Sequence, residues 1–180
     1  LATFLSINAY SMNLVQTGGN YMNDGISIAA STDLVWDENT SITHSEINQL
    51  MQSNLGVTNY IVREDPQGEY IKHVDCWGKF LDVDKILIAK VPTTNANYSK
   101  YEAAATFFAN QTTSRGNKYQ VYRVNSPNGE PYTNSYILNN KVLVPQTGSA
   151  YDADALAAYR AAMPGYTVIG FTGSWESTDA

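Results

Sequence analysis

Three stretches of the chain place apolar residues at helical spacing between residues that begin and end helices. In the first, Thr43 and Glu46 have the spacing of a capping box, and Gly56 stands where a helix would end. The apolar stripe between these signals consists of Ile47, Leu50, Met51 and Leu55. This pattern predicts an amphipathic helix over residues 43–56.

Two further stretches repeat this pattern of a helix start, an apolar stripe and a helix end. Ser99 and Glu102 again have capping-box spacing, ahead of an apolar run that contains Phe107 and Phe108. Asp152 is predicted to cap the third helix, which stops at Pro164 and Gly165. The three expected helix starts lie about 55 residues apart, close to the periods of known repeat architectures.

Strand and turn signals surround each expected helix. A hairpin is predicted before the first helix, because residues 19–22 and 26–31 flank an Asn-Asp-Gly turn. Equivalent hairpins join 79–81 to 85–91 and 135–138 to 142–144, and single strands follow the helices at 57–62, 119–124 and 166–171. The predicted order is therefore β-β-α-β, three times.

We expect one α/β domain over residues 1–180, with units at 14–63, 70–124 and 131–171. An ordinary α+β domain with accidental spacing is the alternative. A single β-β-α-β unit cannot bury its sheet face alone, so its copies must stack or form a ring. In a ring, the segments that lead into the units would meet near the central axis; we call residues 16–21, 70–77, 131–134 and 174–180 the lead-in segments.

Composition and charge exclude several classes of protein. Hydrophobic residues make up 43% and charged residues 16%, which is typical of a globular chain and not of a disordered one. The net charge of -6 argues against nucleic acid as a partner. No apolar run reaches the roughly 18 residues that a membrane span needs, and the first residues carry no basic segment of a signal peptide.

Cysteine and histidine are scarce. Cys76 is the one cysteine, so an intrachain disulfide and a Cys-based zinc site are excluded. His44 and His73 are the two histidines, and His44 falls in the expected cap of the first helix. We therefore expect no metal site.

The most chemically suggestive stretch is the second lead-in segment, which reads Tyr-Ile-Lys-His-Val-Asp-Cys-Trp over residues 70–77. If this stretch is extended, His73 and Asp75 project from one face. A histidine beside a carboxylate suits acid/base chemistry or the binding of a cation. The alternative is a half-buried structural histidine with an unrelated Asp75. Cys76 would face the other way and pack as a small apolar residue.

Four runs of the sequence carry a resemblance to a known family. They are Gly-Gly-Asn-Tyr-Met-Asn-Asp-Gly at 18–25, His-Val-Asp-Cys-Trp-Gly-Lys at 73–79, Glu-Pro-Tyr-Thr-Asn-Ser at 130–135 and Thr-Gly-Ser-Trp-Glu-Ser-Thr-Asp-Ala at 172–180. Together they resemble the Porphyromonas-type peptidylarginine deiminases, relatives of the agmatine deiminases in the guanidino-group-modifying superfamily. The resemblance implies a pentein α/β propeller of five β-β-α-β units, of which this chain would hold an incomplete arc of about three.

The resemblance also implies roles for individual residues. His73 matches the general acid/base and Asp75 the carboxylate that grips the guanidinium nitrogens, while Asn134 matches the asparagine that orients the nucleophilic cysteine. Tyr70 and Thr178 match residues that contact the substrate or lie near the nucleophile loop. From the residues alone, Tyr70 could instead pack at a loop end and Asn134 could form an Asx turn.

Asn20 and Asp24 belong to the first of the four runs. Asn20 is a weaker candidate for the site. Asp24 is interpreted as part of the hairpin turn.

The chain also departs from the family pattern. In the family, the nucleophilic cysteine follows almost directly after the run that ends here at Ala180, and a second guanidinium-binding aspartate and carboxylate-binding arginines lie in motifs absent from this chain. We therefore expect a piece of a larger deiminase that is inactive alone and self-associates through unpaired sheet edges. The resemblance implies no cofactor, and a parent protein that is secreted or lies in the cell envelope.

Alternative functions remain open at the level of sequence. The parent could act on a small free guanidine such as agmatine, although the Cys-Trp-Gly that follows His73-Val-Asp75 favours an arginine-containing peptide. A binding module without catalysis that kept the fold is the second alternative.

Overall fold

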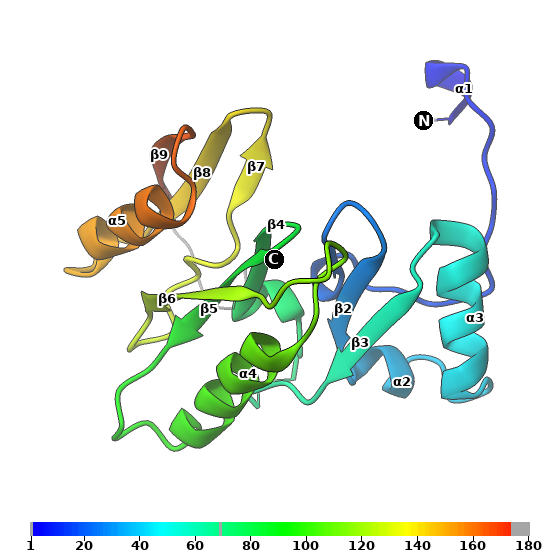
Figure 1. Ribbon diagram of the computed structural model, residues 1–180, viewed down its shortest axis with the longest axis horizontal. Coiled ribbons are helices and arrows are strands. Elements are labelled where there is room, and N and C mark those ends of the chain that lie inside the picture. The colour runs from blue at the N-terminus through cyan, green and yellow to red at the C-terminus, as the bar shows by residue number, and fades with distance from the viewer. Residues whose placement is uncertain (1, 69, 174–180) are drawn as a thin grey trace.

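The fold consists of three small sheets that lie side by side along the molecule (Figure 1). The computed structural model describes residues 2–68 and 70–173. The first sheet contains β1 (Met22–Asn23), β2 (Ile28–Thr32) and β3 (Asn59–Arg63), with α2 (Leu34–Asp37) and α3 (His44–Leu55) between its second and third strands. Ahead of it come α1 (Ala2–Leu5) and the 3-10 helix η1 (Gly18–Asn20).

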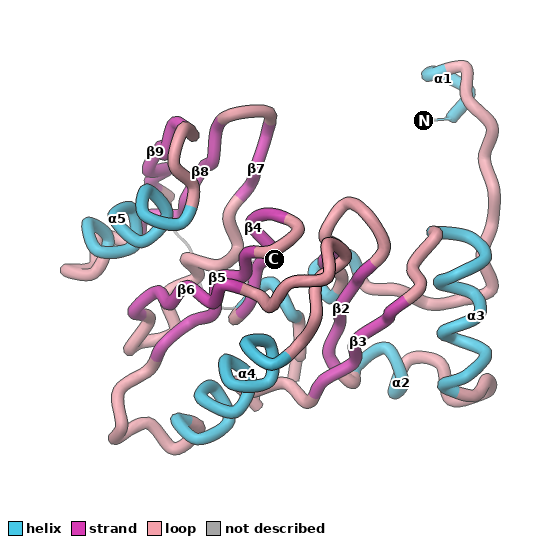
Figure 2. The backbone as a smooth tube through the Cα atoms, in the orientation of Figure 1, coloured by secondary structure: helices cyan, strands magenta, loops and turns pink. Residues whose placement is uncertain are grey.

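The second and third sheets repeat this order with one helix each. The second sheet follows the 3-10 helix η2 (Val74–Cys76) and contains β4 (Gly78–Asp82), β5 (Lys85–Lys90), α4 (Tyr98–Asn110) and β6 (Gln120–Asn125). The third contains β7 (Tyr136–Leu138), β8 (Lys141–Gln146), α5 (Asp152–Ala162) and β9 (Thr167–Thr172). In every sheet the central strand pairs antiparallel with the first strand and parallel with the third. Figure 2 shows this alternation of strand, helix and strand along the chain.

The helix and strand positions predicted from the sequence are confirmed to within a few residues, except for the strand expected at 19–22, where residues 18–20 form η1 and β1 covers only Met22–Asn23. The capping box of α3 is present, because Thr43 Oγ1 accepts a hydrogen bond from the Glu46 amide at 3.2 Å and the Glu46 carboxylate accepts one from the Thr43 amide at 2.7 Å. Gly56 ends α3 in the left-handed conformation at φ 70°. Asp24 serves the first hairpin turn as expected, since Oδ1 accepts three backbone hydrogen bonds at 2.9 Å.

Two predicted helix caps were wrong. Helix α4 begins at Tyr98, one residue before Ser99, and Glu102 does not close a capping box there. Its carboxylate instead binds the guanidinium of Arg123 on β6, at 2.7 Å and 3.1 Å. Asp152 is the first residue of α5 and not its cap.

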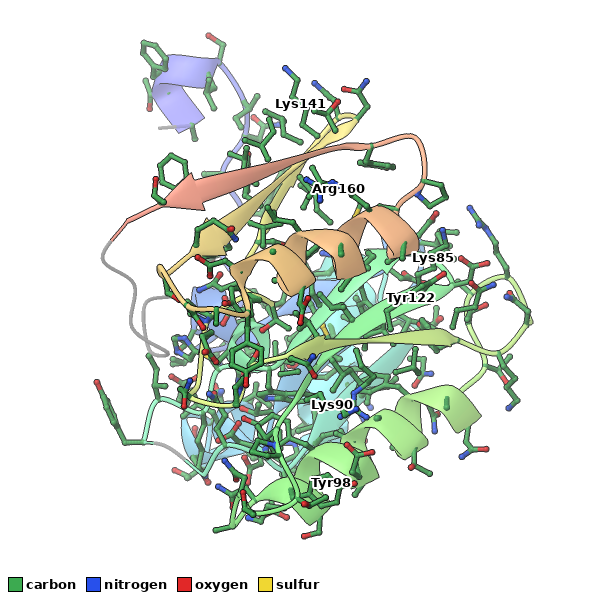
Figure 3. All side chains as sticks on the ribbon, turned by 90° about the vertical axis from the view of Figure 1, so that its left-hand side faces the viewer. Lys85, Lys90, Tyr98, Tyr122, Lys141 and Arg160 are labelled. Atoms are coloured by element: carbon green, nitrogen blue, oxygen red, sulfur yellow. The ribbon has the colours of Figure 1, made fainter. Side chains whose placement is uncertain are left out.

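Two apolar clusters join the sheets. One face of the first sheet, with Met22, Ile28, Ala30 and Ile61, packs against α4 and the second sheet. The opposite face of the second sheet, with Leu81, Leu87 and Val124, packs against α5 and the third sheet. Figure 3 shows α5 lying between the third sheet and the strands β5 and β6 of the second. The three sheets share no strand.

One face of the third sheet is exposed. Tyr136 pairs with Leu143, and Leu143 with Ile169, so these side chains share a face. We call the open face the surface made by Tyr136, Leu138, Leu143, Ile169 and Phe171. Tyr136 is 60% exposed and Phe171 is 53% exposed. The faces of the first and second sheets that occupy the equivalent position are covered by the next sheet and its helix.

These observations describe an α/β chain of three small sheets. Within the described residues, no helix has the length and apolar character to cross a membrane.

Candidate functional site

Three lead-in segments meet where the sheets adjoin. Helix η1 contacts helix η2. The turn at residues 131–134 reaches η2 through a hydrogen bond in which Thr133 Oγ1 donates to the Asp75 carbonyl oxygen at 2.8 Å. The predicted acid/base pair and the predicted orienting asparagine therefore lie on segments that contact one another.

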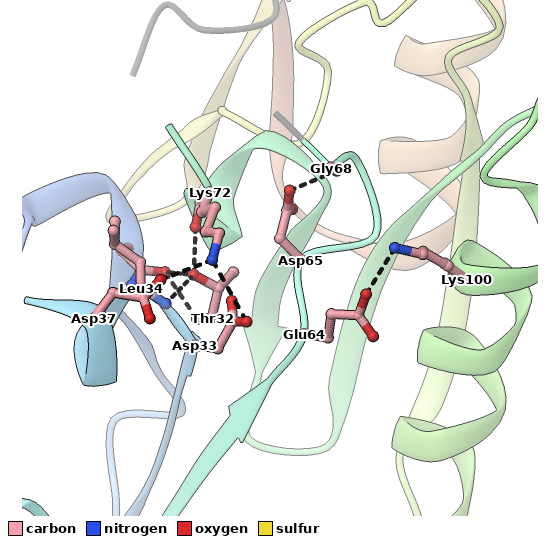
Figure 4. Close-up of polar contacts among 10 residues, drawn as sticks. Thr32, Asp33, Leu34, Asp37, Glu64, Asp65, Gly68, Lys72 and Lys100 are labelled. Carbon is pink, nitrogen blue, oxygen red and sulfur yellow. Dashed lines mark hydrogen bonds and ion pairs between the residues drawn. The ribbon is translucent and has the colours of Figure 1, made fainter. Parts of the chain in front are cut away.

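Contacts from the first sheet fix the backbone just before His73. Lys72 adopts a left-handed conformation at φ 49°, which is costly for a residue with a side chain. Its carbonyl oxygen accepts a hydrogen bond from Thr32 Oγ1. Its ammonium lies 2.8 Å from an Asp37 oxygen and 3.6 Å from an Asp33 oxygen (Figure 4). These contacts stabilise the unusual backbone conformation and so set the direction in which His73 leaves it.

His73 is buried, with 8% of its surface exposed. Its Nδ1 atom is shielded from solvent and has no hydrogen-bond partner among the residues that the structure describes. A buried ring nitrogen without a partner is costly unless a ligand or a proton-transfer partner satisfies it. This feature is consistent with a histidine that acts on a bound molecule.

Asp75 lies in η2, so the extended conformation predicted for this stretch was wrong. The Cys76 amide donates to the His73 carbonyl oxygen at 3.3 Å and the Trp77 amide to the Val74 carbonyl oxygen at 3.2 Å, which closes a tight turn. Burial of Val74 and Trp77 on the core side favours this turn over a strand. Asp75 and His73 nevertheless remain close enough to interact electrostatically.

Burial and two nearby cationic groups act on the Asp75 carboxyl in opposite directions. Burial raises the pKa of Asp75, and the positive charges of His73 and Lys79 oppose that rise. Lys79 shows the complementary effect, because burial lowers the pKa of its ammonium and the Asp75 carboxylate opposes the change. A cation that binds beside this carboxylate would offset part of the burial penalty.

Cys76 is buried, as expected, at 4% exposure. Cys76 does not face away from Asp75 as predicted, however, because its Sγ atom lies 3.9 Å from Asp75 Oδ1. Cys76 packs as a small core residue beside the site.

Asn134 stands at the edge of an open cavity. The cavity has a volume of about 190 Å³ and is also lined by Tyr136, Leu143, Pro145 and Phe171. The turn that carries Asn134 is closed by its own amide, which donates to the Pro131 carbonyl oxygen at 3.0 Å. Asn134 is half-buried, which leaves part of its side chain accessible to a ligand.

The other predicted residues fall in different surroundings. Asn20 is fully buried, and its Oδ1 accepts hydrogen bonds from the Thr32 amide at 2.8 Å and the Thr32 hydroxyl at 2.9 Å. This geometry supports a structural role for Asn20. Tyr70 is 88% exposed and so does not pack at the end of its loop. Thr178 lies outside the described residues.

Sequence reasoning missed two residues that connect the site. Lys79 on β4 donates from Nζ to the Ser135 carbonyl oxygen at 2.5 Å, and Thr133 holds the Asp75 carbonyl oxygen. The available signal was a lysine between Gly78 and Phe80, at the start of a buried strand. No group of three or more His, Cys, Asp or Glu side chains suited to a metal occurs within the described ranges.

A family profile described as Porphyromonas-type peptidyl-arginine deiminase matches residues 1–174. The chain belongs to this family. The resemblance inferred from the four sequence runs is therefore confirmed, and the family is one of guanidino-group deiminases.

Curated relatives and solved structures agree with the family. The chain is 24% identical to an agmatine deiminase of Medicago truncatula over an alignment of 207 residues, gaps included. The alignment covers 94% of this chain and 55% of the relative. A structure of Enterococcus faecalis agmatine deiminase aligns with a TM-score of 0.87 and 19% identity, covering 95% of this chain and 56% of that one. A Porphyromonas gingivalis protein provisionally described as an arginine deiminase aligns with a TM-score of 0.80 and 22% identity, covering 92% and 56%.

The similarity to solved structures supports a statement about the fold. At such low identity, the similarity to solved structures shows that this member of the peptidyl-arginine deiminase family shares their fold. The chain spans about half the length of the curated relatives it matches.

Proposed function

We propose that this chain supplies the acid/base and guanidinium-gripping half of a site that converts peptidyl arginine to citrulline and ammonia. The observation that carries the proposal is the hydrogen bond from Thr133 Oγ1 to the Asp75 carbonyl oxygen at 2.8 Å. It ties the turn that presents Asn134 to the helix that presents Asp75, next to His73. His73, Asp75 and Asn134, whose side chains suit one reaction, thereby come together from the segments that lead into two different sheets.

Asp75 would bind the substrate guanidinium. A carboxylate offers two planar acceptor oxygens, which match the donor fork of a guanidinium. Burial raises the pKa of Asp75, so an incoming cation would be bound strongly in exchange for that penalty. The neighbouring charges of His73 and Lys79 oppose the rise in the pKa of Asp75 and so favour its ionised form.

The chemistry then proceeds in two displacement steps. A cysteine thiolate attacks the guanidinium carbon, and His73 donates a proton to the nitrogen that leaves as ammonia. His73 next removes a proton from water, which attacks the same carbon and expels the thiolate to leave the ureido group of citrulline. We place the thiol outside this chain, because Cys76 is its one cysteine and is buried in the core. Asn134 would orient the thiol and its covalent intermediate.

The architecture proposed for the site is an arc of a pentein propeller. The units would be residues 14–63, 70–124 and 131–171 within one domain over 1–180. The repeated strand pairing supports this, as does the consistent use of one sheet face to meet the next sheet. The open face of the third sheet is the surface that would meet a further unit.

The substrate is proposed to be an arginine residue in a peptide, with Tyr70 and Thr178 as contacts. The family description supports this choice. A small free guanidine is the second candidate, because the curated relatives are agmatine deiminases. Tyr70, at 88% exposure, is accessible enough to touch a peptide.

The test measures ammonia and citrulline formed by the full-length parent protein with an arginine-containing peptide and with agmatine. His73→Ala should reduce turnover by at least about 100-fold, because it removes the proton donor and acceptor. His44→Ala is the matched control, since His44 on α3 is exposed and its ring stacks on that of Trp36 on α2, with 4.0 Å between the ring centroids.

Circular dichroism should show both variants folded. Turnover of the His73→Ala protein at the normal rate would refute the assignment. Binding of the peptide without any turnover by the unaltered protein would instead identify a binding module.

A further inference from the structure

Lys79 makes an unusual contact for a lysine on a strand. Its Nζ does not reach solvent freely but donates to the Ser135 carbonyl oxygen at 2.5 Å, on a segment 56 residues away in sequence. Ser135 is 3% exposed, so water cannot readily replace the lysine as a donor to this carbonyl. The contact links the second sheet to the segment that leads into the third.

A second contact of the same kind lies close by. Thr133, which is 1% exposed, donates from Oγ1 to the Asp75 carbonyl oxygen. Thr133 and Ser135 flank Asn134 on either side, while Asp75 and Lys79 are the two ends of one five-residue segment. Asn134 is therefore held from both sides against the segment that carries Asp75.

The ammonium of Lys79 also interacts electrostatically with the Asp75 carboxylate. Each group is largely shielded from water, and each opposes the effect of burial on the pKa of the other. His73 is the other cationic group that acts on Asp75.

We propose that Lys79 is a positioning residue, which fixes Asn134 in register with Asp75 and supplies a resident positive charge to the Asp75 carboxylate until a cationic substrate replaces it. This inference rests on the proposed function of Asp75 and Asn134. It adds a residue that touches neither the substrate nor the thiol but controls the groups that do.

Lys85 provides a matched control on the same sheet. Its Nζ donates to the Ala162 carbonyl oxygen at 2.9 Å, so it too links the second sheet to the third with a lysine–carbonyl hydrogen bond. Figure 3 places Lys85 beside α5, on β5. Lys79→Met and Lys85→Met therefore remove equivalent interactions, and only Lys79→Met removes a charge that acts on Asp75.

The first measurement is independent of turnover. In the full-length protein labelled with carboxyl-¹³C aspartate, the Asp75 signal is titrated by NMR, with Asp75→Asn used to assign it. Lys79→Met should raise the pKa of Asp75, because a nearby positive charge is lost. Lys85→Met should leave it unchanged. An Asp75 titration that is the same in the Lys79→Met and unaltered proteins would overturn the electrostatic part of the proposal.

The second measurement is the pH profile of kcat/KM for the guanidine substrate that the protein turns over. Lys79→Met should lower kcat by about 100-fold, the cost of a small misplacement of a reacting group, and move the acidic limb of the profile to higher pH. Lys79→Arg keeps the charge but changes the donor geometry, so it should restore the acidic limb and only part of kcat. Equal losses of kcat in Lys79→Met and Lys85→Met would reduce Lys79 to a structural residue.

The two measurements separate this inference from the proposed function. If the unaltered protein shows no turnover, the deiminase proposal fails while the NMR titration still decides whether Lys79 controls Asp75. If His73→Ala abolishes turnover but Lys79→Met changes neither readout, the function stands and the inference fails. Should Lys79→Met not fold, Lys79→Arg carries the test through its loss of kcat.

Discussion

Asn20 and Asn134 occupy the same place in two different sheets and have different surroundings. Each stands two residues before the first strand of its sheet, at Met22 and Tyr136 respectively. Asn20 is fully buried, with both donors of Thr32 on its Oδ1. Asn134 is half-buried and borders an open cavity of about 190 Å³.

What differs between the two asparagines is what covers them. The second sheet packs over the face of the first sheet near Asn20, and Thr32 passes the connection on to the Lys72 carbonyl oxygen. Beside Asn134, the face of the third sheet is the open face, with exposed Tyr136 and Phe171. The position in the repeat thus determines where each asparagine lies. Whether its side chain is buried depends on whether a further sheet covers it.

The largest expected effect comes from replacing the two asparagines by alanine. Asn20→Ala should lower the free energy of unfolding by about 2–3 kcal/mol, because the buried amide of Thr32 loses its acceptor, while the Thr32 hydroxyl keeps the Lys72 carbonyl oxygen. Asn134→Ala should cost less, about 1 kcal/mol, because Asn134 is only half-buried and water can reach the vacated position. Urea denaturation of both variants measures the difference. Similar losses in the two variants would show that the contrast in burial has no energetic counterpart.

A smaller effect separates Asp24, a carboxylate of the first sheet, from Asp75. Burial favours the neutral form of Asp24, but hydrogen bonds from the Ser114 hydroxyl and three backbone amides outweigh it and lower its pKa. Its stabilisation is therefore present above the unfolded pKa of about 3.9 and is lost as the pH falls. The pKa of Asp75 is raised, so its stabilisation is present below the unfolded value and is lost as the pH rises through the folded one.

Stability measured between about pH 3 and pH 6 should reveal the opposite signs. Asp24→Asn should lower the free energy of unfolding by about 1–2 kcal/mol at neutral pH and flatten the acid limb of the curve. Asp75→Asn should stabilise the protein increasingly as the pH rises. If Asp75→Asn destabilised the chain at pH 6, the carboxylate would be structural and not held for a ligand.

The smallest effect concerns self-association of this chain through the open face. Phe171→Glu places a charge on that face and should weaken association by about tenfold, or 1.4 kcal/mol. Ile26→Glu is the control, because Ile26 is similarly exposed, at 58%, but lies in the first hairpin turn. Analytical ultracentrifugation over a range of concentrations distinguishes the two. A monomer at every concentration would rule out association by this face.

The helices and turns that depend on residues close together in the chain could be predicted from the sequence. The capping box at Thr43, the Asp24-Gly25 turn and the apolar spacing of the helices depend on residues within one or two turns of each other, and their predictions were confirmed. The caps expected at Ser99 and Asp152 failed for a tertiary reason. Glu102 on α4 is engaged by Arg123 on β6, and the Asp152 carboxylate accepts a hydrogen bond from the distant Tyr132 hydroxyl in addition to that from the nearby Gly148 amide.

The site was predictable only in part for a related reason. His73 and Asp75 stand two residues apart and carry conspicuous chemistry, so spacing and resemblance identified them as candidates. Lys79 and Thr133 bind backbone carbonyl oxygens of another segment, and any residue can supply a carbonyl. Such partners leave no trace in the pattern of residue types, and only the three-dimensional contact reveals them.

Because the three sheets share no strand, no ladder of backbone hydrogen bonds crosses from the second to the third. The boundary between them is held by interdigitated side chains and by single tethers such as those of Lys79 and Lys85. Heat that loosens this boundary can separate Asn134 from Asp75 while each ladder stays whole. The relative placement of Asn134 and Asp75 therefore depends on these side-chain contacts, whereas each sheet is held by its own backbone hydrogen bonds.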